Sequence, residues 1–335
     1  MKTDKKFRLE WVDYAKAIAI ILVVYRHILI GVQRSGIQVA EWLINANEVV
    51  YSFRMPLFFV LSGIFTAKSI AKRNGKEFLS AKFDSIYYPY LVWGIIQISI
   101  QIILSQYTNA ERNYMDYFFL FTNPRAIDQL WYLSALFSVS LFFYVLYGFA
   151  RINNYFISLL AILLFGGSLY VQEISLVHDL FYYFLFFVVG HLIGNIMLNH
   201  NNYNFFYSYK PFLILTVPFW LSQWYWLHHQ DMNLYLFAII ALLGTAYVFS
   251  ISFILAHYNY ASFLKVAGRY SLQIYLMHLL IVSAVRICFT QLLGVTEPTV
   301  ILLVGWFLGV FLPIIFYKKI KSTVLVLLFK PSLSR

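Results

Sequence analysis

Long apolar runs follow one another along the chain, separated by short polar connections, as is typical of membrane-spanning helices. A helix needs roughly 20 mostly apolar residues to cross the hydrocarbon core of a bilayer. No internal repeat, low-complexity tract or long linker divides the runs into separate domains. The pattern predicts about ten spans, at 13–33, 46–66, 86–105, 128–150, 155–171, 180–198, 211–228, 233–255, 270–289 and 299–317.

The composition agrees with this interpretation. Of the 335 residues, 61% are hydrophobic and only 12% are charged, whereas soluble domains are about 25% charged. The single cysteine, Cys288, excludes an internal disulfide and a thiolate cluster. The net charge of +11 does not indicate nucleic-acid binding, because the cations lie in short connections between apolar runs. We expect an all-α, polytopic integral membrane protein whose single domain covers 1–335.

The basic residues also predict an orientation. Loops on the cytoplasmic side of a membrane are enriched in Lys and Arg. If the N-terminus lies inside, most of the 25 Lys and Arg residues fall in the tails and in alternate, inward connections. Both termini are therefore expected in the cytoplasm, as an N-terminal tail at 1–12 and a C-terminal tail at 318–335. The C-terminal tail mixes Lys with Val and Leu, which suits the inner membrane interface.

The first span contains three ionisable residues that need an explanation. Lys16 and His27 are eleven positions apart, which is three helical turns plus roughly 20°, with a rise of about 16 Å. They therefore share one helix face, and Asp13 precedes Lys16 by one turn, where it can form an ion pair. Ionisable residues within a span usually face a protein interior or a wet cavity. The alternative is a snorkelling Lys16 and a packed core His27.

Two further spans contain polar or aromatic side chains that need an explanation. In the second span, Arg54 is a cation within the apolar run, and Ser62 and Gly63 offer a site of close helix packing. Arg54 is expected either to bind an anion, to pair with a carboxylate, or to snorkel to the surface. The fourth span opens with Asp128 and Trp131, and Trp131 is either part of a site or an interfacial anchor.

The ninth span places a second imidazole within the membrane. Ser271, Tyr275 and His278 step by four and three positions, so they share a helix face. Because the unperturbed pKa of imidazole is near neutrality, His27 and His278 are candidates for general acid–base chemistry. No HExxH or comparable metal-binding spacing occurs in the sequence, so no metal is expected.

A dense basic segment follows the second span. Between Lys68 and Lys82 the sequence carries five cations, with Lys72, Arg73 and Lys76 at its centre. Membrane topology alone can explain the segment, because Lys and Arg in a cytoplasmic loop set the orientation of the protein in the membrane. The functional alternative is a patch at the inner face for a phosphate-bearing ligand, such as a nucleotide or coenzyme A.

Five stretches, in this order, resemble the membrane acyltransferase-3 family and within it the fucose 4-O-acetylase-like branch of polysaccharide O-acetyltransferases. They are DYAKAIAIILVVYRH, FRMPLFFVLSG, YYPYLVWG, LWYLSALF and GRYSLQIYLMH. The first resembles the family signature of a basic residue, ten others and a histidine. The sequence departs from the pattern at Arg54, where the branch often has His, and at Arg26, where a small or apolar residue is usual.

The resemblance implies a multi-pass enzyme of the bacterial cytoplasmic membrane. Such enzymes move an acyl group, most often acetyl, from cytoplasmic acyl-coenzyme A to a hydroxyl of a surface polysaccharide or of its lipid-linked sugar precursor. His27 would act as base or as transient acyl carrier, with His278 assisting. The donor would be bound by Lys16, Asp13, Lys72, Arg73 and Lys76, and the acceptor oriented by Arg54, Ser62, Trp131 and Tyr275.

Two other functions remain compatible with the same residues. A transporter or exporter of a polysaccharide or lipid-linked intermediate would also use buried Lys, Arg and His. No pair of broken helices marks corresponding halves of the chain, which argues against it. A structural subunit of an envelope-synthesis complex would not need the stripe of Lys16 and His27.

Overall fold

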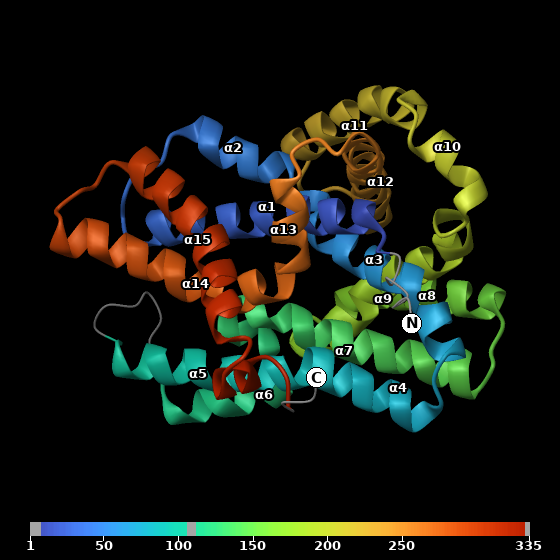
Figure 1. The fold of residues 1–335 in the computed structure, drawn as a ribbon, viewed down its shortest axis with the longest axis horizontal. Coiled ribbons are helices and arrows are strands. Elements are labelled where there is room, and N and C mark those ends of the chain that lie inside the picture. Colours follow the sequence, from blue (N-terminus) through green and yellow to red (C-terminus); the bar gives the residue numbers. More distant parts are fainter. Residues whose placement is uncertain (1–7, 106–111, 332–335) are drawn as a thin grey trace, which may run out of the picture.

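The structure, a computed structural model, describes residues 8–105 and 112–331. Within these residues the regular secondary structure is entirely helical, which confirms the all-α class. Figure 1 shows α1, α5, α7 and α14 running along the long axis of the molecule. The α-helices are α1 (Glu10–Arg34), α2 (Glu41–Val49), α3 (Tyr51–Ala71), α4 (Gly75–Lys82), α5 (Tyr88–Ile103), α6 (Phe119–Thr122), α7 (Trp131–Phe143), α8 (Asn154–Gly167), α9 (Ser175–Met197), α10 (Tyr203–Phe206), α11 (Lys210–His228), α12 (Leu234–Tyr258), α13 (Phe263–Arg269), α14 (Ser271–Ile287) and α15 (Pro298–Ile320).

All of the predicted spans coincide with helices, and the protein is a polytopic membrane protein. Eight helical segments of the described chain are long and apolar enough to cross a bilayer. The two exceptions are α8, which has only 14 residues, and α11, in which polar and Trp or Tyr residues lower the mean hydropathy. The number of about ten spans and the cytoplasmic position of both termini stay predictions.

Helix α1 lies in the middle of the helical bundle (Figure 1). It packs against α3, α12, α13, α14 and α15, so that segments from both halves of the chain surround it. Tyr14, Ile20 and Val24 on this helix are completely buried. The helix that carries Lys16 and His27 is therefore enclosed by protein.

Close packing of α3 against α9 depends on glycine. A Cβ atom built on Gly63 would lie 2.0 Å from the Phe187 carbonyl oxygen, and one built on Gly190 would lie 2.1 Å from that of Val60. Small residues allow membrane helices to approach this closely. The close-packing role expected for the Ser62–Gly63 step is confirmed at Gly63.

Two segments outside the predicted spans are structured, the basic connection and the C-terminal tail. Most of the basic segment at 68–82 is helical, because α3 continues to Ala71 and α4 begins at Gly75. Asn74 and Glu77 form a reciprocal capping box at the start of α4. In the C-terminal tail, the carbonyl oxygen of Leu328 accepts a hydrogen bond of 2.9 Å from Trp93 of α5, so this part of the tail packs onto the bundle.

Adding a methyl group at the α3–α9 contact should destabilise the protein. We expect Gly63→Ala and Gly190→Ala each to cost about 1–3 kcal/mol, because the Cβ would meet backbone rather than a movable side chain. Thermal unfolding of detergent-solubilised protein measures the effect. Gly167→Ala is the matched control, since its Cβ would meet Phe181 at an ordinary 3.6 Å. Equal unfolding midpoints for all three variants would contradict the packing argument.

Candidate active site

The two histidines expected from the sequence come together between α1 and α14. The ring centroids of His27 and His278 are 5.0 Å apart, with an angle of 56° between the planes. His278 is completely buried. Its Nδ1 donates to the carbonyl oxygens of Ile274 and Tyr275, at 3.0 and 2.8 Å. Because these carbonyls can only accept, Nε2 carries the free lone pair, and it has no hydrogen-bond partner within the described residues.

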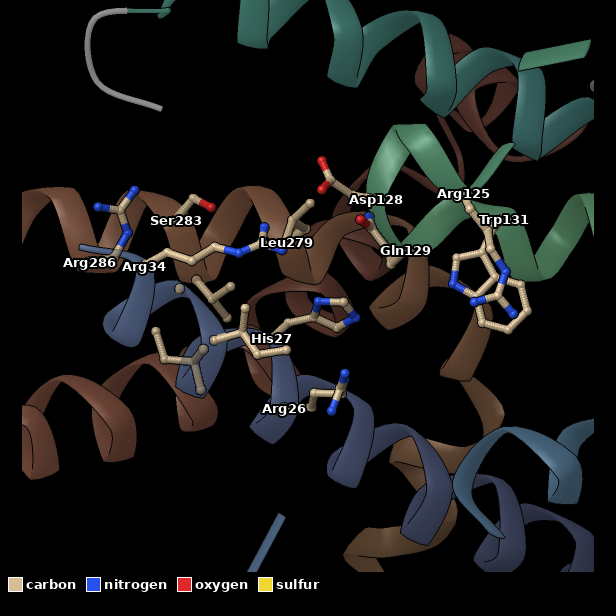
Figure 2. A pocket seen from close by; sticks show the side chains of 14 residues that line it. Arg26, His27, Arg34, Arg125, Asp128, Gln129, Trp131, Leu279, Ser283 and Arg286 are labelled. Atoms are coloured by element: carbon tan, nitrogen blue, oxygen red, sulfur yellow. The ribbon is translucent and has the colours of Figure 1, made fainter. Parts of the chain in front are cut away.

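His27 lines a hollow made of two cavities, which we name the outer chamber because it lies toward the end of α1 that the Lys and Arg pattern predicts to face outward. Its smaller compartment has a volume of about 370 Å³ and its larger compartment about 690 Å³. Figure 2 shows His27 in the smaller compartment, among side chains from α1, α14 and the segment before α7. The residues that line both compartments are Arg26, His27, Arg125, Gln129 and Trp131.

Trp131 forms part of an aromatic wall in the larger compartment. Its ring stacks on that of Tyr183, with centroids 5.3 Å apart. The Arg125 guanidinium lies 4.4 Å from the Trp131 ring centroid and forms an ion pair of 2.6 Å with Asp179. Trp131 therefore belongs to the chamber wall. A wall of stacked rings with a few fixed polar groups is typical of small-molecule sites.

The segment before α7 is held in an unusual backbone conformation. Asp128 has φ 57° and ψ −135°, so the fourth predicted span, which was expected to begin as a helix at Asp128, is kinked there and its α-helix begins at Trp131. Its carboxylate accepts a hydrogen bond of 2.9 Å from Gln101 and pairs with Arg112 at 3.3 Å. A non-glycine residue in this region costs about 1–3 kcal/mol and is characteristic of functional sites. Here the kink brings Gln129 and Trp131 to the chamber.

A chain of buried amides joins this kink to α14. The Tyr275 hydroxyl donates to the carbonyl oxygen of Gln129. The Gln129 amide donates to Gln97 at 3.0 Å, and the Gln97 amide donates to the carbonyl oxygen of Leu276 at 2.9 Å. Both glutamines are almost completely buried. Neither glutamine was among the residues expected at the site, because a single glutamine within an apolar run carries no motif.

A separate cavity of about 350 Å³, which we name the inner cavity, contains Lys16. Ser62, Lys82, Tyr132 and Ser271 also line it, and Tyr275 lines both this cavity and the larger outer compartment. Ser62, expected beside the acceptor, is thus in the cavity of Lys16. Lys82 was not among the expected site residues, although its place in the basic segment pointed to it.

The expected ion pair between Asp13 and Lys16 does not form. The Asp13 carboxylate is held by Arg8 through two hydrogen bonds of 2.6 and 2.8 Å, and Arg269 lies 3.6 Å away. The bidentate geometry of a guanidinium favours Arg8 over the single ammonium of a lysine. The hydrogen bonds to Asp13 raise the pKa of Arg8. Within residues 8–105 and 112–331, Lys16 has no carboxylate at ion-pair distance.

The remaining predicted residues lie around these cavities. Arg54 is 2% exposed, lines the larger outer compartment, and donates to the Asn47 side chain at 3.1 Å. No carboxylate of the described chain lies at ion-pair distance from Arg54, so the pairing with a carboxylate that the sequence offered as one alternative does not form. Lys72, Arg73 and Lys76 are exposed at the turn between α3 and α4, outside the lining of the inner cavity. Arg73 donates to Ser69, which does line it, at 2.7 Å.

The described residues contain no group of three His, Cys, Asp or Glu side chains that could hold a metal ion. The expectation of no metal stays a prediction. The chemistry available at the site is that of two imidazoles, buried amides and cations.

The amino-acid sequence matches a known protein family. The sequence model of a family described as an acyltransferase domain matches residues 9–318. The nodulation protein NolL of Mesorhizobium japonicum is 25% identical over 151 residues, covering 45% of this chain and 39% of that protein. NolL of Sinorhizobium fredii is 24% identical over 199 residues, covering 57% and 52%. The alignments thus span about half or less of these relatives, and no solved structure matches.

The Asp13 carboxylate should stabilise the fold through its arginines. We expect Asp13→Asn to cost about 1.5–3 kcal/mol, because two charged hydrogen bonds to a nearly buried carboxylate are lost. Glu10→Gln is the control: Glu10 pairs with Lys265 at 3.2 Å but is 41% exposed, so its loss should cost about 0–1 kcal/mol. Denaturation of the purified variants measures both. A larger effect at Glu10 would overturn this assignment.

Proposed function

The chain belongs to the acyltransferase-domain family, and on that premise we propose that it is an O-acetyltransferase acting on a sugar. The donor is acetyl-coenzyme A from the cytoplasm, and the acceptor is a hydroxyl of a surface polysaccharide or of its lipid-linked precursor. The family membership favours an enzyme over the alternative of an exporter. The protein would act in the cytoplasmic membrane of a bacterium.

The observation that carries the proposal is the placement of Lys16 and His27 in different cavities along one helix. Lys16 lines the inner cavity and His27 lines the outer chamber. Tyr275 lines the inner cavity and the larger outer compartment, so it lies at the partition between them. This arrangement supports a donor that enters beside Lys16 and an acceptor that waits beside His27.

The inner cavity offers what a coenzyme A thioester requires. Lys16 and Lys82 supply positive charge, and Lys72, Arg73 and Lys76 add charge at the nearby turn. Phosphates are attracted to such a concentration of cations. We assign these lysines and Arg73 to the coenzyme phosphates, and the cavity to the thioester arm. Asp13 contributes indirectly, by holding Arg8 and Arg269.

The reaction itself needs a base and groups that stabilise negative charge. We propose that the imidazole of His27 takes the proton of the acceptor hydroxyl. The hydroxyl oxygen then bonds to the acyl carbon, the carbon–sulfur bond breaks, and the coenzyme thiolate leaves with the proton that His27 had taken, which regenerates the free imidazole. His278 lines neither the outer chamber nor the inner cavity, so we assign its Nε2 lone pair to a hydrogen bond from His27 that orients the base.

The larger outer compartment suits a sugar. Trp131 and Tyr183 provide flat surfaces, while the guanidinium of Arg54 provides hydrogen-bond donors. We assign Arg54 to the acceptor or to the tetrahedral intermediate, because it has no carboxylate partner among the described residues. The Tyr275 side chain is fixed by its hydrogen bond to Gln129, and its ring would form part of the surface that positions the acceptor.

Replacing His27 should remove the reaction. We expect His27→Asn to lower kcat by roughly two to four orders of magnitude, because asparagine cannot accept and return a proton. His278→Asn should cause a smaller loss. The assay is transfer of radiolabelled acetyl groups to the polysaccharide or its precursor by purified protein.

The control for these variants is His191→Asn. His191 is also buried within a membrane-spanning helix, but it bonds to Asn154 at 3.0 Å and lines neither the outer chamber nor the inner cavity. It should keep near-normal kcat. Normal acetylation by His27→Asn at equal protein levels would show that His27 is a packed core residue.

Removing cations from the inner cavity should weaken donor binding. We expect Lys16→Ala and Lys82→Ala each to raise the apparent KM for acetyl-coenzyme A about tenfold, the scale of one charged hydrogen bond. Lys16→Ala should also reduce turnover, and Lys16→Arg should retain part of both. Lys210→Ala, at the start of α11, is the control. If all three alanine variants had the same KM as the parent, the donor site would lie elsewhere.

A further inference from the structure

The smaller outer compartment holds more positive charge than its surroundings neutralise. Four arginines line it, together with one carboxylate, Asp128. Asp128 is already paired with Arg112, and Arg125 with Asp179. No carboxylate of the described chain lies at ion-pair distance from the other three lining arginines, Arg26, Arg34 and Arg286.

Arg286 provides the clearest sign of a ligand. The residue is only 5% exposed, yet its side chain lines the compartment. No hydrogen bond or ion pair joins its guanidinium to the described part of the chain. A buried charge is stable only when it is paired and hydrogen-bonded. The guanidinium therefore lacks the partner that its burial demands.

The three arginines surround one space from two helices. Arg26 and Arg34 come from α1, and Arg286 comes from α14. Figure 2 shows Arg34 and Arg286 on one side of His27, with Arg26 close to it. The Arg26 guanidinium also lies 4.9 Å from the Tyr51 ring centroid, a contact that leaves its charge uncompensated. Like charges gathered in one cavity repel one another unless an anion joins them.

We infer that the smaller outer compartment binds a diphosphate group carried by the sugar acceptor. This inference rests on the proposed function, since it names the class of acceptor. A carboxylate would offset one of the three charges, whereas a diphosphate offsets two or more. Guanidinium groups also match phosphate oxygens with paired hydrogen bonds. Because the two compartments share His27, a diphosphate held here leaves the attached sugar in the larger compartment, beside the imidazole.

Binding of inorganic pyrophosphate to the purified full-length protein tests the site without any acyl donor. We expect saturable binding by titration calorimetry, weakened about tenfold or more in Arg286→Gln and in Arg34→Gln. Arg286→Lys should bind with intermediate affinity. Lys319→Gln, a charge change on the exposed end of α15, should bind like the parent. Unchanged acetyl-coenzyme A affinity in each variant shows that the fold is intact.

A second probe, farnesyl diphosphate, separates the two sources of such a group. Tighter binding than pyrophosphate, with competition between the two, supports a lipid-borne acceptor. Equal affinity with competition supports a soluble glycosyl diphosphate. No saturable pyrophosphate binding, or equal affinity in the arginine variants and the parent, would overturn the site.

The two proposals fail in different ways. If pyrophosphate binds through Arg286 but no acetyl group is transferred to any sugar, the anion-binding site is confirmed and the proposed function is wrong. If acetyl transfer to a sugar occurs without pyrophosphate binding, the proposed function is confirmed and the diphosphate inference is wrong.

Discussion

The cost of placing ionisable groups inside a membrane governs this structure. Lys16 and His27 cannot face lipid, so the helix that carries them has to be enclosed by protein. Helices α3, α12, α13, α14 and α15 provide that enclosure, and they come from both ends of the chain. The polar face of α1 therefore requires other helices to pack around it. The cavities lie where these helices do not close completely against Lys16 and His27.

Separating the two cavities has a chemical consequence. A thioester and a base in one open, wet space would favour hydrolysis, whereas a closed site excludes competing water. The partition here is made by Tyr275, whose hydroxyl is held by Gln129, which in turn bonds to Gln97. These groups are fixed by backbone and amide partners from α5, α14 and the kink at Asp128, so the Tyr275 ring is held at the border of the two cavities. In the proposed reaction the acyl carbon would have to meet the acceptor hydroxyl beside this ring. The network thus connects the strained backbone before α7 to the position of the imidazoles.

Sequence patterns predicted those features of the structure that arise within a single helix. The spacing of Lys16 and His27 identified the polar face of α1, and apolar run length identified the long helices. The Asp13 prediction failed because a partner one turn away on the same helix was assumed, while Arg8 lies outside it and binds more favourably. Gln97, Gln129 and the kink at Asp128 were not predictable, since their roles arise from contacts between distant segments. The meeting of His27 with His278 needed the tertiary packing of α1 on α14.

The two ends of α1 carry different cations, and the difference is chemically meaningful. Lysine dominates the inner cavity, where a flexible, strongly hydrated point charge would follow the proposed donor as it enters and leaves. Arginine dominates the outer chamber, where planar, weakly hydrated guanidinium groups can hold an anion in one orientation. In the proposed reaction, orientation matters more for the acceptor, because only one of several similar sugar hydroxyls would have to reach His27. A fixed anion at one end of the acceptor restricts its rotation, so selection among hydroxyls can arise from the arginines rather than from contacts with each hydroxyl.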